Sequence, residues 1–181
     1  VEQIVVPETY FFRDRKPFKF LMEYARTHWQ TRTSKIRILS APCSTGEEAY
    51  SIAIALLEAG LSTHQLNIQA IDISKAAIAK AQRAIYGKNS FRGEPWIDQT
   101  RYFEQTSEGH QVNELVRSLV HFRQSNLLAA FPVAQPEYDV IFCRNLLIYL
   151  ESAACSQLMK TFDQLLLPEG LLFVGSSETN K

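Results

Sequence analysis

Residues 36–50 read IRILSAPCSTGEEAY, and this stretch joins two different hydrophobic patterns. Its first five positions form a short apolar and β-branched run, which is typical of a strand. From Glu47 to Glu58, apolar residues recur at helical spacing. The stretch therefore predicts a β-strand, a tight loop that turns at Gly46, and a helix.

The rest of the chain repeats this alternation of strand and helix. The expected strands span 66–71, 120–124, 138–143 and 171–174, and the expected helices span 16–30, 74–85 and 151–166, with Gly87 ending the second helix and a turn at 168–170. Such alternation predicts an α/β domain with a mostly parallel sheet and helices on both faces. Ligands of these sheets bind at the carboxyl ends of the strands, near the point where strand order reverses. That rule selects the loops after Ser40, Ile71 and Phe142.

Residues 88–119 show no clear period and are punctuated by Gly, Asn, Pro and Ser. We expect small strands or turns in this region rather than a long helix. Trp96, Tyr102 and Phe103 would either form an exposed edge that docks an extended peptide or pack against the main sheet. Because aromatic side chains are usually core residues, packing is the favoured interpretation.

The composition fits one domain. The chain has 181 residues, 46% of them apolar, with 19 basic and 19 acidic side chains, so neither disorder nor a nucleic-acid footprint is expected. Cys43, Cys143 and Cys155 form no disulfide framework and indicate reduced thiols in the cytoplasm. No apolar run is long enough for membrane insertion, and no signal peptide is recognisable. Because Val1 is not an initiator Met, we expect a piece of a longer protein.

The loop of residues 41–50 has an unusual composition for a phosphate site. Phosphate loops combine several glycines, a helix N-terminus and often a Lys, whereas this loop has one glycine and two acids, Glu47 and Glu48. Carboxylates repel a phosphate and suit a cationic group, such as the amino group of a methionine moiety. An alternative interpretation with the same weight is that both acids only stabilise the first turn of the helix through its dipole.

Asp72 ends the second expected strand, 26 residues after Gly46. In dinucleotide-binding folds an acid at about 20 residues from the first loop binds the ribose hydroxyls. The alternative is an ordinary turn or cap residue. The surrounding strand–loop–helix–strand frame favours the ribose contact, but it does not distinguish NAD from S-adenosylmethionine.

Six segments carry a more specific pattern and occur in a fixed order. They read ETYFFRD (8–14), APCSTGEEAYS (41–51), AIDI (70–73), SNLL (125–128), IFCRNLLIY (141–149) and GLLFVGSSE (170–178). Together they resemble the CheR family of chemotaxis receptor glutamate methyltransferases. The resemblance implies a single Rossmann-like class I methyltransferase domain over residues 1–181, which binds S-adenosylmethionine. It also implies a small β-subdomain inserted at about 88–119.

The resemblance assigns roles to residues of these segments. Those expected to bind the cofactor are Thr9, Arg13, Glu48, Asp72, Asn126, Leu127, Arg144 and Asn145, and those expected to act in methyl transfer are Arg13, Arg144 and Tyr149. Glu48 would meet the methionine end and Asp72 the ribose, while Asn126 and Leu127 would flank the adenine. No metal ion is expected. The chain departs from the family at Pro7, where many members carry a cofactor-contacting Asn, and because it begins almost at the Thr9 segment we expect it to lack the family's usual N-terminal helical domain.

The implied reaction is methyl transfer to glutamate side chains of methyl-accepting chemotaxis receptors, giving γ-methyl esters. A glutamate has a pKa of about 4.3 and is already ionised at neutral pH, so it needs no strong general base. The expected partner is the helical cytoplasmic signalling domain of a receptor, and the expected state is a cytoplasmic monomer. Two alternatives are a cofactor-binding scaffold domain without turnover and a nucleotide-dependent oxidoreductase of similar fold.

Overall fold

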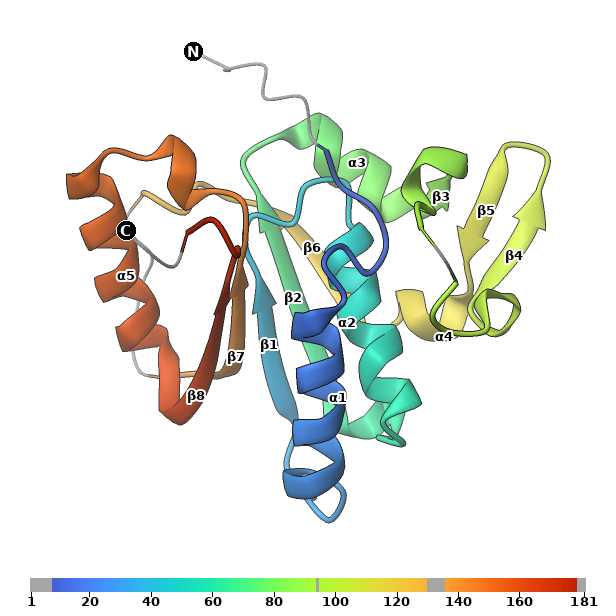
Figure 1. The fold of residues 1–181 in the computed structure, drawn as a ribbon, viewed down its shortest axis with the longest axis horizontal. Coiled ribbons are helices and arrows are strands. Elements are labelled where there is room, and N and C mark those ends of the chain that lie inside the picture. The colour runs from blue at the N-terminus through green and yellow to red at the C-terminus, as the bar shows by residue number, and fades with distance from the viewer. Residues whose placement is uncertain (1–7, 94, 130–135, 179–181) are drawn as a thin grey trace.

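The centre of the protein is a five-stranded parallel sheet (Figure 1). The computed structural model describes residues 8–93, 95–129 and 136–178. The strands are β1 (Ile36–Ser40), β2 (Leu66–Asp72), β6 (Val120–Gln124), β7 (Tyr138–Cys143) and β8 (Leu166–Val174). They lie in the order β6-β2-β1-β7-β8, and every neighbouring pair is parallel. The predicted α/β fold with a mostly parallel sheet is confirmed.

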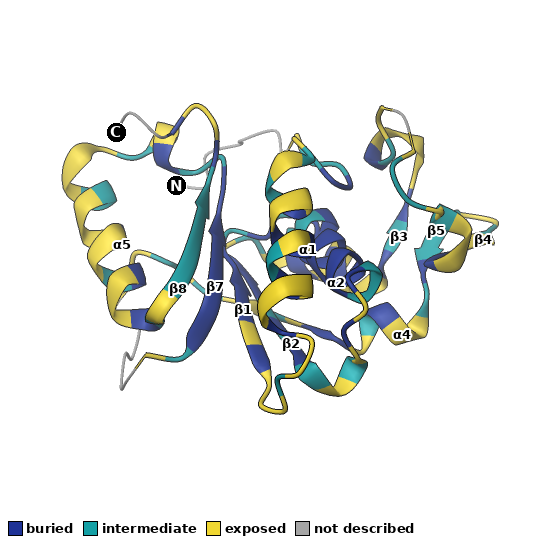
Figure 2. Ribbon diagram, turned by 60° about the horizontal axis from the view of Figure 1, so that its bottom comes forward, coloured by how far each residue is buried: buried dark blue, intermediate teal, exposed yellow. Residues whose placement is uncertain are grey.

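Helices cover both faces of this sheet. They are α1 (Lys16–His28), α2 (Glu47–Glu58), α3 (Lys75–Arg83) and α5 (Ser152–Leu165). Because side chains alternate along a strand, Ile38 and Phe142 join the core with α1 and α2, whereas Leu39 and Ile141 join a second core with α5. Figure 2 shows the resulting pattern, in which β7 and most of α2 are buried, β8 is mostly intermediate, and α1 and α5 are exposed on their outer sides. No helix in the described ranges has the length and apolarity needed to cross a bilayer.

A second, antiparallel sheet lies to one side of the first (Figure 1). Its strands are β3 (Ile85–Tyr86), β4 (Phe103–Thr106) and β5 (Gly109–Val112), in the order β3-β5-β4, and α4 (Glu114–Arg117) leads from it back to β6. Tyr102 and Phe103 are 5% and 8% exposed and belong to the main core, against which Trp96 also packs. The packing interpretation of these three aromatic residues is confirmed.

Helix α3 is shorter than the sequence suggested. It ends at Arg83, and Ala84 adopts a left-handed conformation with φ of 54°. The prediction that the helix continues to about Ile85 and stops at Gly87 is wrong, because Ile85–Tyr86 instead pairs with β5 as strand β3. Pairing with a strand more than twenty residues further on overrides the helical pattern.

Strand β8 is longer than expected. The segment 168–170 was predicted as a turn before a strand at 171–174, but the whole of Leu166–Val174 is one strand. The register changes inside it, because Tyr138 pairs with Leu166 whereas Val140 pairs with Leu171. The extra residues form an irregularity of the strand, and Glu169 has φ of 64° there.

Candidate functional site

The strand order reverses between β1 and β7, and the loops that follow these strands lie side by side (Figure 1). The N–H of Ala41, just after β1, donates to the carbonyl of Phe142 at 2.9 Å. Two residues later, the N–H of Cys43 donates to the carbonyl of Ile71 at 2.8 Å. The β1 loop is therefore tied to both neighbouring strands, at the edge where ligands of such sheets bind.

Gly46 allows the β1 loop to turn into α2. Its φ is 95°, and a Cβ at this position would lie 2.8 Å from the Ala81 Cβ and 2.9 Å from the Tyr86 hydroxyl. The Tyr86 hydroxyl donates to the carbonyl of Thr45 at 2.7 Å. The path of the loop is thus set by core contacts, and only glycine fits without displacing them.

Glu48 faces Arg144 across the junction of β1 and β7. Its carboxylate accepts hydrogen bonds from the Ser40 hydroxyl at 2.8 Å and from the Arg144 Nη1 at 3.3 Å. The side chain of Glu48 is 13% exposed and that of Arg144 is 2% exposed. Burial raises the pKa of Glu48, while Arg144 and Ser40 oppose this effect. The Glu48 carboxyl is therefore poorly solvated, its two side-chain hydrogen bonds come from one guanidinium and one hydroxyl, and the charge of Arg13 also lowers its pKa.

Glu47, the neighbouring acid, has a different environment. It is 1% exposed, and its carboxylate accepts hydrogen bonds from the hydroxyls of Thr45 at 2.6 Å and Ser90 at 2.9 Å. Ser90 ends a 3₁₀ turn at Lys88–Ser90, so Glu47 fastens that turn to the start of α2. The two acids that the sequence left equivalent are thus separated, with Glu47 structural and Glu48 turned toward the strand junction.

Arg144 also holds the N-terminal segment. Its Nη2 donates to the Asp14 carboxylate at 2.5 Å and to the Arg13 carbonyl at 3.0 Å. Its guanidinium lies 5.8 Å from the ring centroid of Phe18. The side chain of Arg13, partly exposed, donates to the carbonyl of Glu8. Asp14 was not predicted as a site residue; its position beside Arg13 in ETYFFRD was the only signal for it.

Asp72 joins the loops after β1 and β2. It is 8% exposed, and its two carboxylate oxygens accept the N–H of Ser44 at 2.8 Å and of Ser74 at 2.9 Å. These bonds match the turn interpretation of Asp72. Each oxygen keeps a second lone pair, so the same carboxylate can also accept from a hydroxyl of a ligand.

The segment after β6 adjoins Asp72. The N–H of Ser125 donates to the Asp72 carbonyl at 2.9 Å. Asn126 is exposed, and its side-chain oxygen accepts the N–H of Leu128 at 3.0 Å. Leu127 is partly buried against the core beneath α5. Asn126 and Leu127 therefore lie at the same edge of the sheet as the β1 loop.

The loop after β7 carries the remaining predicted residues. Asn145 has φ of 60°, and a 3₁₀ turn at Leu147–Tyr149 follows it. Tyr149 is 59% exposed. Thr9, on the N-terminal segment, is partly buried. A further residue that the sequence did not single out, Glu178, is 3% exposed and accepts N–H groups of this loop; its place at the end of GLLFVGSSE was its only signal.

Two buried polar atoms at this edge have no hydrogen-bond partner within the described ranges. They are the Ser44 hydroxyl and the Arg144 Nε. Buried polar groups are normally paired, so these two donors on adjoining loops are available to a ligand, although Asn67 and Arg117, away from this edge, also have unpaired buried atoms. A molecule with an amino group, a carboxylate and a ribose, such as S-adenosylmethionine, has the groups that suit Glu48, Arg144 and Asp72. The residues present therefore fit this cofactor.

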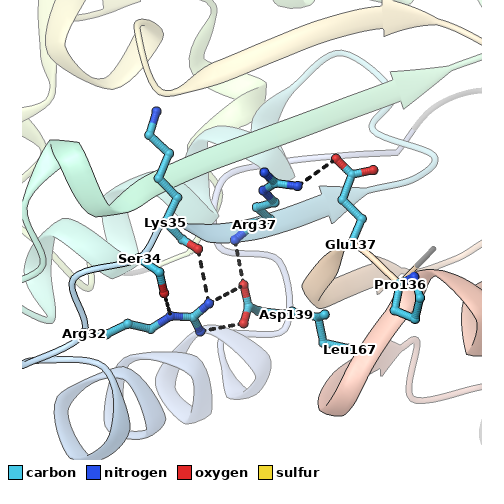
Figure 3. A pocket seen from close by; sticks show the side chains of 8 residues that line it. All are labelled: Arg32, Ser34, Lys35, Arg37, Pro136, Glu137, Asp139 and Leu167. Atoms are coloured by element: carbon cyan, nitrogen blue, oxygen red, sulfur yellow. Dashed lines mark hydrogen bonds and ion pairs between the residues drawn. The ribbon is translucent and has the colours of Figure 1, made fainter. Parts of the chain in front are cut away.

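Two cavities in the described residues lie elsewhere, and none of the predicted site residues lines them. Figure 3 shows the first, at the amino ends of β1, β7 and β8. There Arg32 forms a two-point ion pair with Asp139, at 2.5 and 3.3 Å, and the N–H of Arg37 donates to the same carboxylate at 2.8 Å. This cluster fastens the strands at the end opposite to the β1 loop.

A parallel sheet of this order, an acidic strand-to-helix loop and an acid at the end of the second strand fit the Rossmann-like fold of class I S-adenosylmethionine-dependent methyltransferases. Solved structures agree. PKMT2 from Rickettsia typhi in complex with AdoHcy has a TM-score of 0.56 and 13% identity, over 93% of this chain and 26% of that one. The DszA carbon methyltransferase also has a TM-score of 0.56, with 18% identity over 86% and 33%. At these identities the likeness concerns the fold.

The family model described as CheR methyltransferase, SAM binding domain, matches residues 7–181, and the chain belongs to this family. It is similar to the probable biofilm formation methyltransferase WspC of Pseudomonas aeruginosa (43% identical, over 99% of this chain and 43% of that protein). It is also similar to chemotaxis protein methyltransferase 2 of P. aeruginosa (40%, over 94% and 62%) and to the chemotaxis protein methyltransferase of Escherichia coli K12 (34%, over 94% and 60%). The chain thus spans about half the length of these relatives. The family match confirms the resemblance and the predicted cofactor, S-adenosylmethionine.

Proposed function

We propose that this protein transfers the methyl group of S-adenosylmethionine to glutamate carboxylates of a chemotaxis-type receptor, forming γ-methyl esters. The observation that carries the proposal is the buried Glu48–Arg144 pair at the β1–β7 junction, in a chain that belongs to the CheR family. The relatives named as chemotaxis methyltransferases support the receptor as acceptor.

In the proposed complex, the residues around the β1 loop bind the two ends of the cofactor. Glu48 attracts the amino group of the methionine end, and Arg144 attracts its carboxylate. Asp72 accepts from the ribose hydroxyls, and the β6 loop at Asn126 and Leu127 flanks the adenine. Because Arg144 already holds the backbone at Arg13, the N-terminal segment with Thr9 closes the site and excludes water.

The cofactor supplies an electrophilic methyl group on a sulfonium. The acceptor carboxylate is ionised at neutral pH, so the protein has to position it and limit its hydration rather than deprotonate it. The positions of the histidines are consistent with a reaction that needs no general base. All four are described, and they lie in or beside α1, β2, β5 and β6, away from the loops at the carboxyl edge. Arg13 can hold a carboxylate through its planar guanidinium, and Tyr149, exposed beside the site, orients the incoming side chain.

The test combines binding and turnover. Calorimetry is expected to show binding of S-adenosylhomocysteine but not of NAD. Incubation with labelled cofactor and receptor signalling domains is expected to give label that base releases as methanol, as a carboxyl methyl ester does. Base-stable label would contradict the proposed linkage. Cofactor binding without transfer to any receptor of the source organism would favour the scaffold alternative.

A further inference from the structure

Glu178 lies just after β8 and is almost fully buried, with 3% of its surface exposed. Its Oε2 accepts the N–H of Gly175 at 2.6 Å and of Asn145 at 3.0 Å, and its Oε1 accepts the N–H of Leu147 at 2.8 Å. Its own N–H donates to the Gly175 carbonyl at 2.9 Å. One carboxylate therefore links the loop after β7 to the loop after β8. Hydrogen bonds to an ionised acceptor are roughly twice as strong as neutral ones.

The backbone that Glu178 holds is an unusual one. Asn145 has φ of 60°, in the left-handed region that side chains other than glycine adopt at a cost. The 3₁₀ turn that carries Tyr149 begins two residues later, at Leu147. By accepting the N–H groups at both Asn145 and Leu147, the carboxylate determines the direction in which the chain leaves β7.

The close approach of the Glu178 carboxylate requires a residue without a side chain at position 175. A Cβ at Gly175 would lie 2.5 Å from the Glu178 Oε2 and 3.3 Å from the Asn145 nitrogen. Its backbone is not in the left-handed region, so close approach of the carboxylate, rather than conformational freedom, accounts for the glycine. The site of the carboxylate is thus built from both loops.

The cofactor side of the site is held by other contacts. Arg144 is fastened by Glu48 and Asp14, and Glu48 also by Ser40. None of these bonds involves Glu178. The loop after β7 is therefore held at Arg144 by side chains on the cofactor side and at residues 145–147 by Glu178, while the Cys155 thiol donates to the Leu147 carbonyl at 3.5 Å and Leu147 packs in the second core.

We propose that Glu178 is a positioning residue for the acceptor side of the methyl-transfer site, which acts by fixing the loop of residues 145–149 and with it Tyr149. This inference rests on the proposed function. It requires that loss of the Glu178 carboxylate lowers kcat, or raises KM for the acceptor, by more than it weakens the affinity for the cofactor, to which Asn145 of the same loop is expected to contribute.

Two variants test the inference, and a third variant serves as a matched control. Glu178→Gln places an amide N–H₂ group opposite backbone donors, and Gly175→Ala pushes the carboxylate away without removing it. Asp139→Asn is the control, because Asp139 is also buried and accepts a backbone N–H, from Arg37, but at the opposite end of the sheet (Figure 3). For each variant we would measure the melting temperature, the Kd for S-adenosylhomocysteine, and kcat and KM for a receptor domain.

Both test variants are expected to lose roughly 10–100-fold in kcat/KM for the acceptor, as a small misplacement of reacting groups does, with the Kd within about threefold of wild type. Asp139→Asn is expected to lower the melting temperature with unchanged kcat and KM. Wild-type kcat and KM in Glu178→Gln would overturn the inference. So would a Kd weakened in proportion to the loss of kcat, because that result indicates a general structural role.

Amide hydrogen exchange, followed by NMR, tests the hydrogen bonds from the Asn145 and Leu147 amides to Glu178 without a need for turnover. Protection of the Asn145 and Leu147 amides in wild type, and its loss in Glu178→Gln, is the expected result. Unprotected amides in wild type would overturn the inference even if neither variant folds. If wild type transfers no methyl group, the proposed function fails, while the exchange data still decide whether Glu178 holds the loop.

Discussion

Replacement of Arg144 by Met should expose how strongly the site depends on one cation. The substitution leaves the Glu48 carboxylate, 13% exposed, with the Ser40 hydroxyl as its remaining side-chain donor. Removing one partner of a buried pair costs about 3–5 kcal/mol. Asp14 is 46% exposed and can be solvated by water, so the penalty arises mainly at Glu48. We therefore expect a loss of about 3 kcal/mol, or roughly 6–12 °C in Tm for a chain of this length.

This loss should depend on pH in a defined direction. Burial raises the pKa of Glu48, and Arg144 is the largest influence that opposes it, so the variant should raise the folded-state pKa further. A carboxyl with a raised folded pKa carries no charge penalty below its unfolded pKa of about 4.3. The penalty develops as the pH rises from there through the folded pKa. The difference in Tm between Arg144→Met and wild type is thus expected to be larger at about pH 8 than at about pH 5.

Thermal unfolding followed by circular dichroism at both pH values provides the measurement. The control is the double variant Arg144→Met with Glu48→Gln. It removes the buried Glu48 carboxylate that has lost its cationic partner, and it should be more stable than Arg144→Met at about pH 8. A Tm difference that does not change with pH, or a double variant no more stable than the single one, would refute the reasoning.

Three further changes test other parts of the site. Gly46→Ala should destabilise the protein by about 2–4 kcal/mol in urea unfolding, because its Cβ would overlap Ala81 and Tyr86 at positive φ; a loss below about 0.5 kcal/mol would show that the loop can move aside. Asp72→Asn should weaken binding of S-adenosylhomocysteine about tenfold in calorimetry, equivalent to about 1.4 kcal/mol, and unchanged affinity would remove Asp72 from the ribose site. Tyr149→Phe should leave the free energy of unfolding within about 0.5 kcal/mol of wild type, since Tyr149 is 59% exposed, but it should lower kcat. A wild-type kcat would show that the Tyr149 hydroxyl does not orient the acceptor carboxylate.

The local pattern of the chain was sufficient to predict the parallel sheet and to select the edge of it at which we place the candidate site. The β1 loop and α2 were recognisable because a strand, a glycine turn and an amphipathic helix each depend on residues close together in sequence. The parallel arrangement followed from the alternation of such units. The carboxyl ends of the strands then identified the edge where Glu48, Asp72 and Arg144 lie.

The features that the sequence did not reveal depend on partners far along the chain. Ile85–Tyr86 became a strand because it pairs with β5. Glu47 and Glu48 are adjacent and chemically identical, yet one accepts from Ser90, 43 residues away, and the other from Arg144, 96 residues away. Glu178 reaches back 33 residues to Asn145. The contacts of a carboxylate depend on the donors that packing brings to it, so the different environments of these acids were decided only when the sheet brought its loops together.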